Sequence, residues 1–314
     1  MTFDPVVLFF VLGLVAGVMR SDLKVPGAIY EVLSIYLLLA IGLKGGVELS
    51  KHSLGALAGS SALVLLAGAV TPLVAFPILR WLGRLSRADS ASIAAHYGSV
   101  SVVTFSVGVA YLTQVGQAFE GYLVVFLVLL EMPALIIGVI LARQGQGAVN
   151  WKRLFHEVFF GKSLLLLTGG LLIGYVSGPE AIKPISPLFF DLFKGVLALF
   201  LLEMGLVAAS RMAGLRDHGA FLLGFAIFMP LLSAVGGVLT GQLIGLSVGG
   251  TTLLATLYAS ASYIAAPAAM RIAVPEANPA LSIGASLGVT FPFNIFLGLP
   301  IYHWMAKTAH AWGA

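Results

Sequence analysis

Two runs of hydroxyl side chains lie inside long apolar segments, one in each half of the chain. The first, YGSVSVVTFSVGVAY, carries Ser99, Ser101 and Thr104, and the second, YASASYIAAPAAMRI, carries Ser260 and Ser262. Glycine or proline accompanies each run, so we expect both helices to break there. Free backbone N–H groups at helix N-termini can hold an anion, while hydroxyl and carbonyl oxygens can coordinate Na⁺. These five residues form a candidate substrate site, unless they only pack helices together.

Carboxyl and amide side chains inside apolar segments are the next candidates. Glu131 stands in the middle of FLVLLEMPALIIG, where a charge costs about 2.5 to 3.5 kcal/mol. Glu131 is expected to act as a cation ligand or a proton carrier. If the cation is Na⁺, its site is expected near Ser101, Ser262 and Glu131. The alternative is that Glu131 only hydrogen-bonds an unwound helix. In the last apolar segment Thr290 and Asn294 share one helical face. They either join Glu131 as ion ligands or contact only a neighbouring helix.

Other polar groups lead to weaker predictions. Glu203, in LALFLLEMGL, lacks a hydroxyl cluster on its helix, which favours a structural or inter-subunit role. Asp191 and Lys194 share one helical face and are expected to neutralise each other. Lys44, in IGLKGG, is expected to snorkel to the outer surface. His96 near a serine suggests a hydrolase, but no Gly-x-Ser-x-Gly elbow is present, so a hydrogen-bonded histidine is favoured.

The sequence carries no signature of a known class of enzyme or nucleotide-driven pump. It has no cysteine, and it lacks the HExxH, Walker A and strand-linked Gly-x-Gly-x-x-Gly patterns. We therefore expect no catalytic residues, no metal beyond a possible coupling Na⁺ and no cofactor. The driving force for transport is then an ion gradient.

Composition indicates a multi-pass membrane protein. The 314 residues are 59% hydrophobic and only 10% charged, whereas soluble domains carry roughly a quarter charged residues. The net charge of +4 comes from basic residues between apolar segments, so membrane topology explains it better than a nucleic-acid partner. Asp4 stands where a signal peptide has its basic region, which predicts that the first apolar segment is retained.

Ten segments are long enough to cross a bilayer core of about 30 Å. Residues 143–162 form a polar cytoplasmic linker between a first half (1–142) and a second half (163–314) of five spans each. Because each half has an odd number of spans, the second half enters the membrane from the side opposite to the first. The sequence therefore predicts an inverted repeat in an all-α integral membrane protein. The excess of Lys and Arg on the linker side places both termini outside. The predicted spans are 5–19, 28–43, 54–79, 90–113, 121–142, 163–177, 187–209, 218–246, 249–271 and 280–306.

The sequence resembles the sodium-dependent bicarbonate transporter family over nearly its whole length. The resemblance lies in the early VPGAIYEVLSIYLLLAIGLKGGVEL block, GSVSVVT in the fourth span and EMPALI in the fifth. It is closest in the C-terminal RIAVPEANPALSIGAS run, which is similar to the family's Arg-x-Gly-Ile-Pro-x-Ala-Asn-Pro signature. The chain is identified as a divergent member.

The resemblance implies ten helices divided into two domains. Spans 3 to 5 and 8 to 10 would form a core domain, and spans 1, 2, 6 and 7 a gate or scaffold domain, often in a homotrimer. Substrate and Na⁺ would lie where the interrupted core helices meet, close to Ser101, Thr104, Ser260, Ser262 and Glu131. A PII-like regulatory protein is a partner of cyanobacterial members, but the linker between the halves is short here, which argues against such docking.

Two departures from the family pattern bear on ion coupling. The family's Ser-Ser-Ser-Asp in the ninth span reads Ser260-Ala261-Ser262-Tyr263 here, so a phenol replaces a carboxylate that helps to bind Na⁺ in the family. In the fourth span the family's Ser-Gly-Ser-Thr reads SVVT. A glycine and a hydroxyl are therefore absent.

The favoured function is that of a secondary transporter in a bacterial inner membrane. It would import a small anion, with bicarbonate as the first candidate, coupled to Na⁺ or H⁺. One alternative is an organic-anion symporter or cation/proton exchanger in which Glu131 and Glu203 titrate. Others are a membrane-embedded hydrolase using His96, and a transport-dead sensor or scaffold, suggested by Tyr263.

Overall fold

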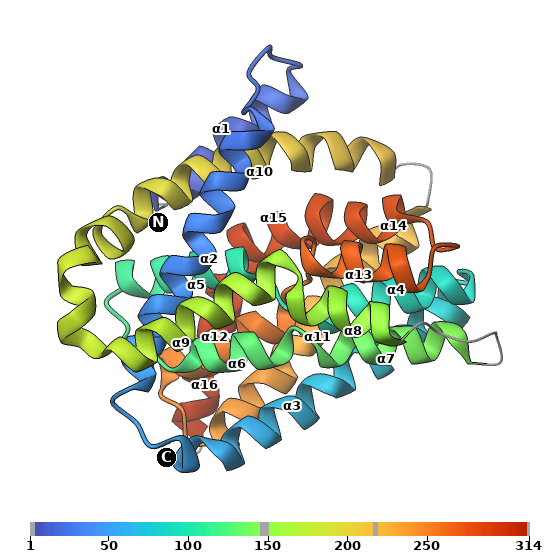
Figure 1. Cartoon of the computed structure of the whole chain (residues 1–314). Helices are drawn as coiled ribbons and strands as arrows, with labels where there is room; N and C mark the ends of the chain where they lie inside the picture. The colour runs from blue at the N-terminus through green and yellow to red at the C-terminus, as the bar shows by residue number, and fades with distance from the viewer. Residues whose placement is uncertain (1–3, 145–150, 216–218, 313–314) are drawn as a thin grey trace.

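The computed structural model describes residues 4–144, 151–215 and 219–312, and over these residues the secondary structure is helical, with no strand (Figure 1). In these ranges eight helical stretches have the length and apolarity to cross a membrane. Two further apolar helices, α1 (Pro5–Val18) and α12 (Val248–Ala259), are shorter. The chain is therefore a multi-pass membrane protein, as its composition predicts.

Most helices are apolar along their length, and several follow one another with short interruptions. The amphipathic helix α8 lies in the segment predicted to be only a polar linker, where its Leu154 and Val158 are buried. The remaining elements, with π-helical η1, η3, η5 and η6 and 3₁₀-helical η2, are α2 (Gly27–Leu49), α3 (Leu54–Pro77), η1 (Ile78–Leu82), α4 (Arg87–Gly98), α5 (Val102–Gln114), α6 (Leu123–Leu130), α7 (Pro133–Arg143), α8 (Trp151–Phe160), α9 (Lys162–Ile182), η2 (Lys183–Ile185), η3 (Pro187–Asp191), α10 (Phe193–Leu215), α11 (Gly219–Leu243), α13 (Ala265–Ala273), α14 (Pro279–Ile283), η5 (Gly284–Thr290), α15 (Phe291–Phe293), η6 (Asn294–Gly298) and α16 (Leu299–Trp312).

Four helices pack as two close pairs, α2 against α9 and α1 against α10. A Cβ atom on Gly42 or Gly46 would collide with the backbone of α9, and one on Gly170 or Gly174 would collide with the backbone of α2. Gly13 meets the backbone of α10 in the same way. Small residues four positions apart allow this approach of transmembrane helices. In Figure 1, α10 and α1 lie across the top of the molecule and α3 runs along the bottom.

In the described chain, three apolar stretches are divided into separate helices by short non-helical segments. Helix α4 ends at Gly98 and α5 begins at Val102, while α12 ends at Ala259 and α13 begins at Ala265. The third break separates α6 from α7 just before Pro133, because proline lacks an N–H donor and its ring clashes with the preceding turn. The first two breaks occur where the hydroxyl runs predict them. The last stretch alternates between α-helix and π-helix, a pattern found often at functional sites.

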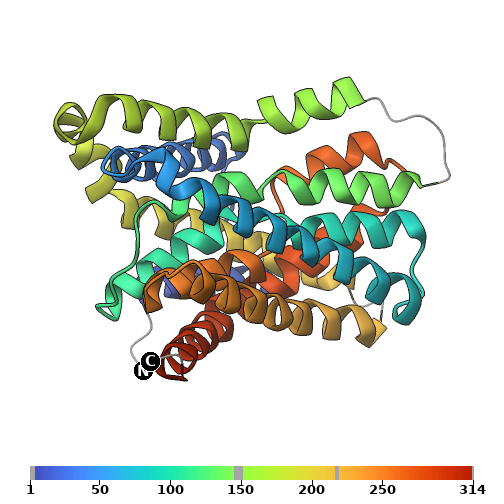
Figure 2. The same cartoon turned by 90° about the horizontal axis from the view of Figure 1, so that it is seen from below.

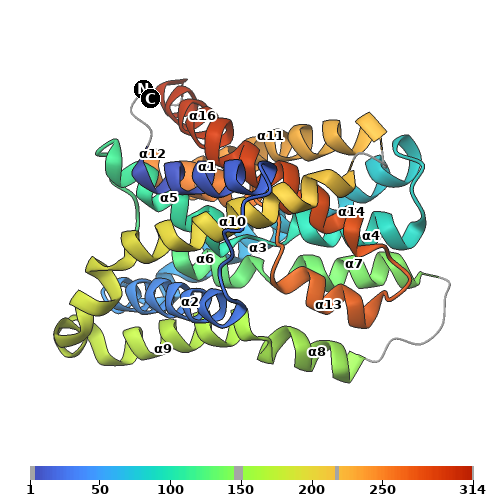
Figure 3. The ribbon, with the colours of Figure 1, turned by 90° about the horizontal axis from the view of Figure 1, so that it is seen from above.

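The two chain ends lie at the same end of the helix bundle (Figures 2 and 3). The turn between α3 and α4 lies at the opposite end. Near the first end Asp4 caps α1, and its Oδ2 atom is 3.6 Å from Lys194 Nζ on α10. The expected pair of Lys194 with Asp191 is thus wrong, because the packing of α1 on α10 brings the buried Asp4 to the lysine instead.

Candidate functional site

The breaks in α4–α5 and α12–α13 lie against each other. The backbone N–H of Ser101 donates to Ser260 Oγ over 2.9 Å, and the backbone N–H of Ser262 donates to the carbonyl oxygen of His96 over 2.8 Å. All three serines are buried. Two segments that are far apart in the sequence are therefore joined by hydrogen bonds at the points where both helices lose their regular backbone bonding.

The hydroxyl groups of Ser101 and Ser262 bind the first turns of the two helices that follow the breaks. Ser101 Oγ accepts from the N–H of Thr104 over 3.2 Å, and Ser262 Oγ accepts from the N–H of Ala266 over 3.2 Å. A serine hydroxyl has a donor as well as acceptor sites, so each can still donate to a ligand. Helices α5 and α13 thus present N-termini, which carry partial positive charge, beside the same cavity.

That cavity, which we call the serine cavity, is small, with a volume of about 10 Å³. Its lining includes Ser101, Ser262, Tyr263, Ser163 at the start of α9, and Glu131 from the α6–α7 break. Glu131 Oε1 accepts from Ser163 Oγ over 2.8 Å, whereas Oε2 is buried without a hydrogen-bond partner among the described residues. A buried carboxylate that lacks compensation is costly in a membrane. A cation or a proton would offset that cost.

A second, larger cavity of about 160 Å³ adjoins the serine cavity. Glu131 and Ser163 line both, and the larger one extends to Glu157 on α8 and to Lys162. The carboxylate therefore separates a small chamber at the helix breaks from a wider space beside α8.

Two other predicted substrate ligands bind the protein itself. Ser99 Oγ donates to the carbonyl oxygen of Glu131 over 3.0 Å, which fastens the α4–α5 break to the α6–α7 break. Ser260 Oγ donates to the carbonyl oxygen of Leu257 over 2.7 Å while it accepts from Ser101. Thr104 is buried one turn into α5. These residues surround the serine cavity without lining it.

Thr290 and Asn294 lie away from the serine cavity and hold neighbouring helices. Thr290 Oγ1 donates to the carbonyl oxygen of Ala226 over 2.6 Å. Asn294 Nδ2 donates to the carbonyl oxygen of Ala259, at the end of α12, over 2.9 Å, and its Oδ1 accepts from Tyr302 Oη over 2.6 Å. Asn294 therefore satisfies a carbonyl group that the break in α12–α13 leaves free.

The remaining candidates occupy separate surroundings. The ring Nδ1 of His96 bonds the carbonyl oxygen of Ser92 over 2.7 Å, and its Nε2 has no partner among the described residues. No serine hydroxyl bonds this ring in the described part of the chain, so the arrangement lacks the contact that a hydrolase needs. Glu203 lines a different cavity, of about 380 Å³, together with Arg211 and Arg271. It is not brought to Glu131.

Ser163 lines the serine cavity but was not predicted from the sequence. It forms the only hydrogen bond to the Glu131 carboxylate among the described residues, from the other half of the chain. A single hydroxyl near the start of an apolar segment gives no spacing signal that could reveal such a contact. No group of three or more His, Cys, Asp or Glu side chains able to hold a metal ion occurs in the described ranges. The oxygen donors at the cavity are a carboxylate and hydroxyls, a set that suits Na⁺.

The chain matches the family model of the Na⁺-dependent bicarbonate transporter superfamily over residues 5–307. No curated protein matches it significantly. The match covers nearly the whole chain and includes all the elements that surround the serine cavity. It is a family of membrane transporters rather than of enzymes. The resemblance seen in the sequence is thus confirmed, and the chain belongs to the Na⁺-dependent bicarbonate transporter superfamily.

Proposed function

We propose that this protein imports a small anion, bicarbonate first among the candidates, by coupling its movement to Na⁺. The observation that carries the proposal is the juxtaposition of two broken helices around a cavity with one buried carboxylate. The N–H groups and hydroxyls at the starts of α5 and α13 bind the anion there. The unpartnered oxygen of Glu131 binds the cation, which brings the two charges together.

Tyr263 leaves the serine cavity with a single carboxylate among its described lining residues. Its hydroxyl oxygen is buried near Ser101. A phenol can donate to an anion but supplies no negative charge. We therefore assign the coupling ion to Glu131, with Ser101 and Ser262 as further oxygen donors.

Transport requires the serine cavity to open to each side of the membrane in turn. In our proposal the ten spans form two inverted repeats, and the pairs α1–α10 and α2–α9 form a gate against which the broken helices move as a core. The contact between Ser163 on α9 and Glu131 then joins gate to core. Occupancy of Glu131 by a cation weakens this contact and permits the movement.

The proposed orientation places both chain ends outside a bacterial inner membrane. The two termini lie at one end of the bundle (Figure 3). The turn between α3 and α4, which follows Arg80 and includes Arg84, lies at the other end. The positive-inside rule favours the cytoplasm for that basic end.

Uptake of radiolabelled bicarbonate by reconstituted vesicles tests the proposal. A Na⁺ gradient should drive uptake, and Ser262→Ala should lower it about tenfold, since one hydrogen bond to a charged ligand is lost. Ser210→Ala, which changes an exposed serine on α10, is the matched control and should transport normally. Wild-type uptake by Ser262→Ala, or no response to Na⁺, would refute this assignment.

Coupling to H⁺ is the second candidate, because Glu131 can carry a proton as well as bind Na⁺. The buried and singly hydrogen-bonded carboxylate favours it as the alternative. In the same vesicles, stimulation by a pH gradient without Na⁺ identifies proton coupling. Stimulation by Na⁺ at equal pH on both sides identifies sodium coupling.

A further inference from the structure

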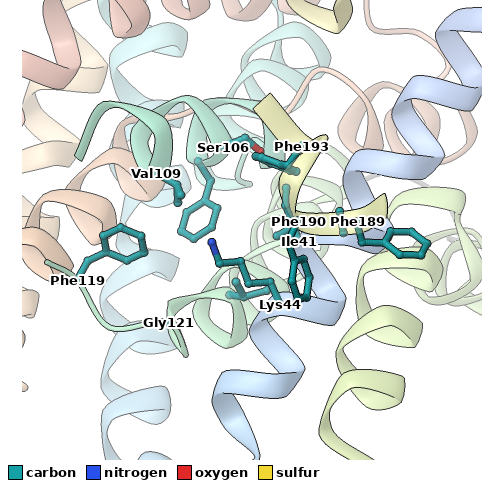
Figure 4. Close-up of a pocket in the computed structure, with 12 residues that line it drawn as sticks. Ile41, Lys44, Ser106, Val109, Phe119, Gly121, Phe189, Phe190 and Phe193 are labelled. Atoms are coloured by element: carbon teal, nitrogen blue, oxygen red, sulfur yellow. The ribbon is translucent and has the colours of Figure 1, made fainter. Parts of the chain in front are cut away.

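A second pocket, lined mainly by apolar side chains, lies between α2 and α5 (Figure 4). It has a volume of about 70 Å³. Five phenylalanines dominate its wall, and the polar side chains in its lining are Lys44 and Ser106. The wall is formed by Ala40, Ile41, Lys44, Phe105, Ser106, Val109, Phe119, Gly121, Val124, Phe189, Phe190 and Phe193, and we call it the Lys44 pocket.

The packing of α2 directs Lys44 into this space. Gly42 and Gly46 face the backbone of α9, and Gly45 faces the side chain of Val124 on α6. These contacts leave Lys44 on the remaining side of the helix. Figure 4 shows its amino group pointing into the pocket, between the aromatic side chains. The side chain of Lys44 is exposed, as its position in the sequence predicts, and its amino group lies at this pocket.

The ammonium group of Lys44 has no counter-ion among the described residues. Glu48, one turn further along α2, binds Lys51 over 2.8 Å. Glu120, just before Gly121 of the pocket wall, accepts from the backbone N–H and the hydroxyl of Ser247. Asp191 follows the lining phenylalanines in η3 but makes no ion pair within 4.0 Å with the lysine. The pocket thus presents one exposed ammonium group that makes no ion pair among the described residues.

We propose that the Lys44 pocket binds a carboxylate with a compact aromatic or branched aliphatic body. The carboxylate would bind Lys44 Nζ, while the apolar body would contact the phenylalanines and Val109. A hydrated inorganic anion such as bicarbonate is too small and too polar for this lining. The pocket is therefore a site distinct from the serine cavity, and binding to it does not depend on the transport proposal.

The ligand class follows from the physics of the lining. Contact with a ring or branched chain removes apolar area from water, at about 25 cal/mol per Å². A charge-assisted hydrogen bond to the ammonium group adds specificity for an anionic head. A neutral molecule of the same shape would lack that bond, and a bare anion would lack the apolar contact. Only the combination uses both features of the pocket.

Equilibrium binding of 2-naphthoate to the purified protein, followed by its fluorescence, tests the proposal. The neutral analogue 2-naphthalenemethanol is the ligand control. Lys44→Met removes the charge and keeps the length of the side chain, and it should weaken naphthoate binding about tenfold or more. Lys51→Met, which alters a lysine that is already paired outside the pocket, is the matched control and should bind as the wild type does.

A second variant addresses the apolar wall with Lys44 intact. Val109→Phe fills space beside the lysine and should also abolish binding. The site is supported if naphthoate binding is saturable, if Lys44→Met and Val109→Phe both weaken it, and if the alcohol binds weakly. Equal binding to wild type and Lys44→Met, equal binding of acid and alcohol, or no saturable binding at millimolar naphthoate overturns it.

Discussion

Replacing Glu131 by glutamine should stabilise the protein while it removes coupling to Na⁺. The Oε1 atom of glutamine can still accept from Ser163 Oγ, which lies 2.8 Å from the carboxylate in the wild type. The unpartnered Oε2 becomes an uncharged amide group. The substitution removes a buried charge and keeps the hydrogen bond to Ser163. It therefore favours the folded protein in the absence of Na⁺.

The size of the effect follows from the cost of the buried group. Leaving a buried polar atom unpaired costs about 1 to 3 kcal/mol, and more when it is charged. We therefore expect the free energy of unfolding of Glu131→Gln to rise by about 1 to 2 kcal/mol without Na⁺. In the wild type, Na⁺ at one hundred times its dissociation constant should contribute about 2.7 kcal/mol. The variant should show no such gain.

Thermal unfolding of detergent-solubilised protein in sodium chloride and in choline chloride measures both quantities. The wild type should melt at a higher temperature in sodium chloride, and Glu131→Gln should melt at the same temperature in both salts. Choline controls for ionic strength, since it is too large for the serine cavity. A variant that remains stabilised by Na⁺, or that is less stable than the wild type in choline, would contradict this reasoning.

Three other changes probe the packing around the site. Gly174→Leu should lower the free energy of unfolding by about 1 to 3 kcal/mol, because the new side chain would meet the backbone of α2. Gly169→Leu, on the same helix, is the control. Its side chain would enter open space, so this variant should melt like the wild type. Asn294→Ala should cost about 2 kcal/mol, measured by thermal unfolding, because it leaves a buried carbonyl and the hydroxyl of Tyr302 without partners. Ser99→Ala should lower both stability and uptake, because it releases the link to the Glu131 carbonyl; normal uptake at normal stability would show that this link is dispensable.

The helix breaks could be predicted from the sequence because their cause is local. Hydroxyl, glycine and proline residues weaken a helix wherever they gather, and the apolar surroundings of Ser101 and Ser262 marked these runs as unusual. Glu131 was recognisable for the same reason, since a charge inside an apolar span is costly wherever it lies. Membrane class and the positions of the two breaks at the hydroxyl runs therefore follow from residue types alone.

The roles of the remaining polar residues depend on contacts between distant parts of the chain. Asn294 satisfies the end of α12, and Ser163 reaches Glu131 from the start of α9. Neither contact has a signature in residue spacing. Lys44 is a similar case, because the glycines of α2 determine its direction only once their partner helices are known. Tertiary packing decides these assignments.

A density map of the protein prepared in sodium bicarbonate tests the central claim most directly. We predict density for a cation beside the Oε2 atom of Glu131 and for a small anion between Ser101 and Ser262. The Lys44 pocket should hold no bicarbonate under these conditions. Ligand density confined to another cavity, with the serine cavity unchanged in a preparation that transports bicarbonate, would contradict the account.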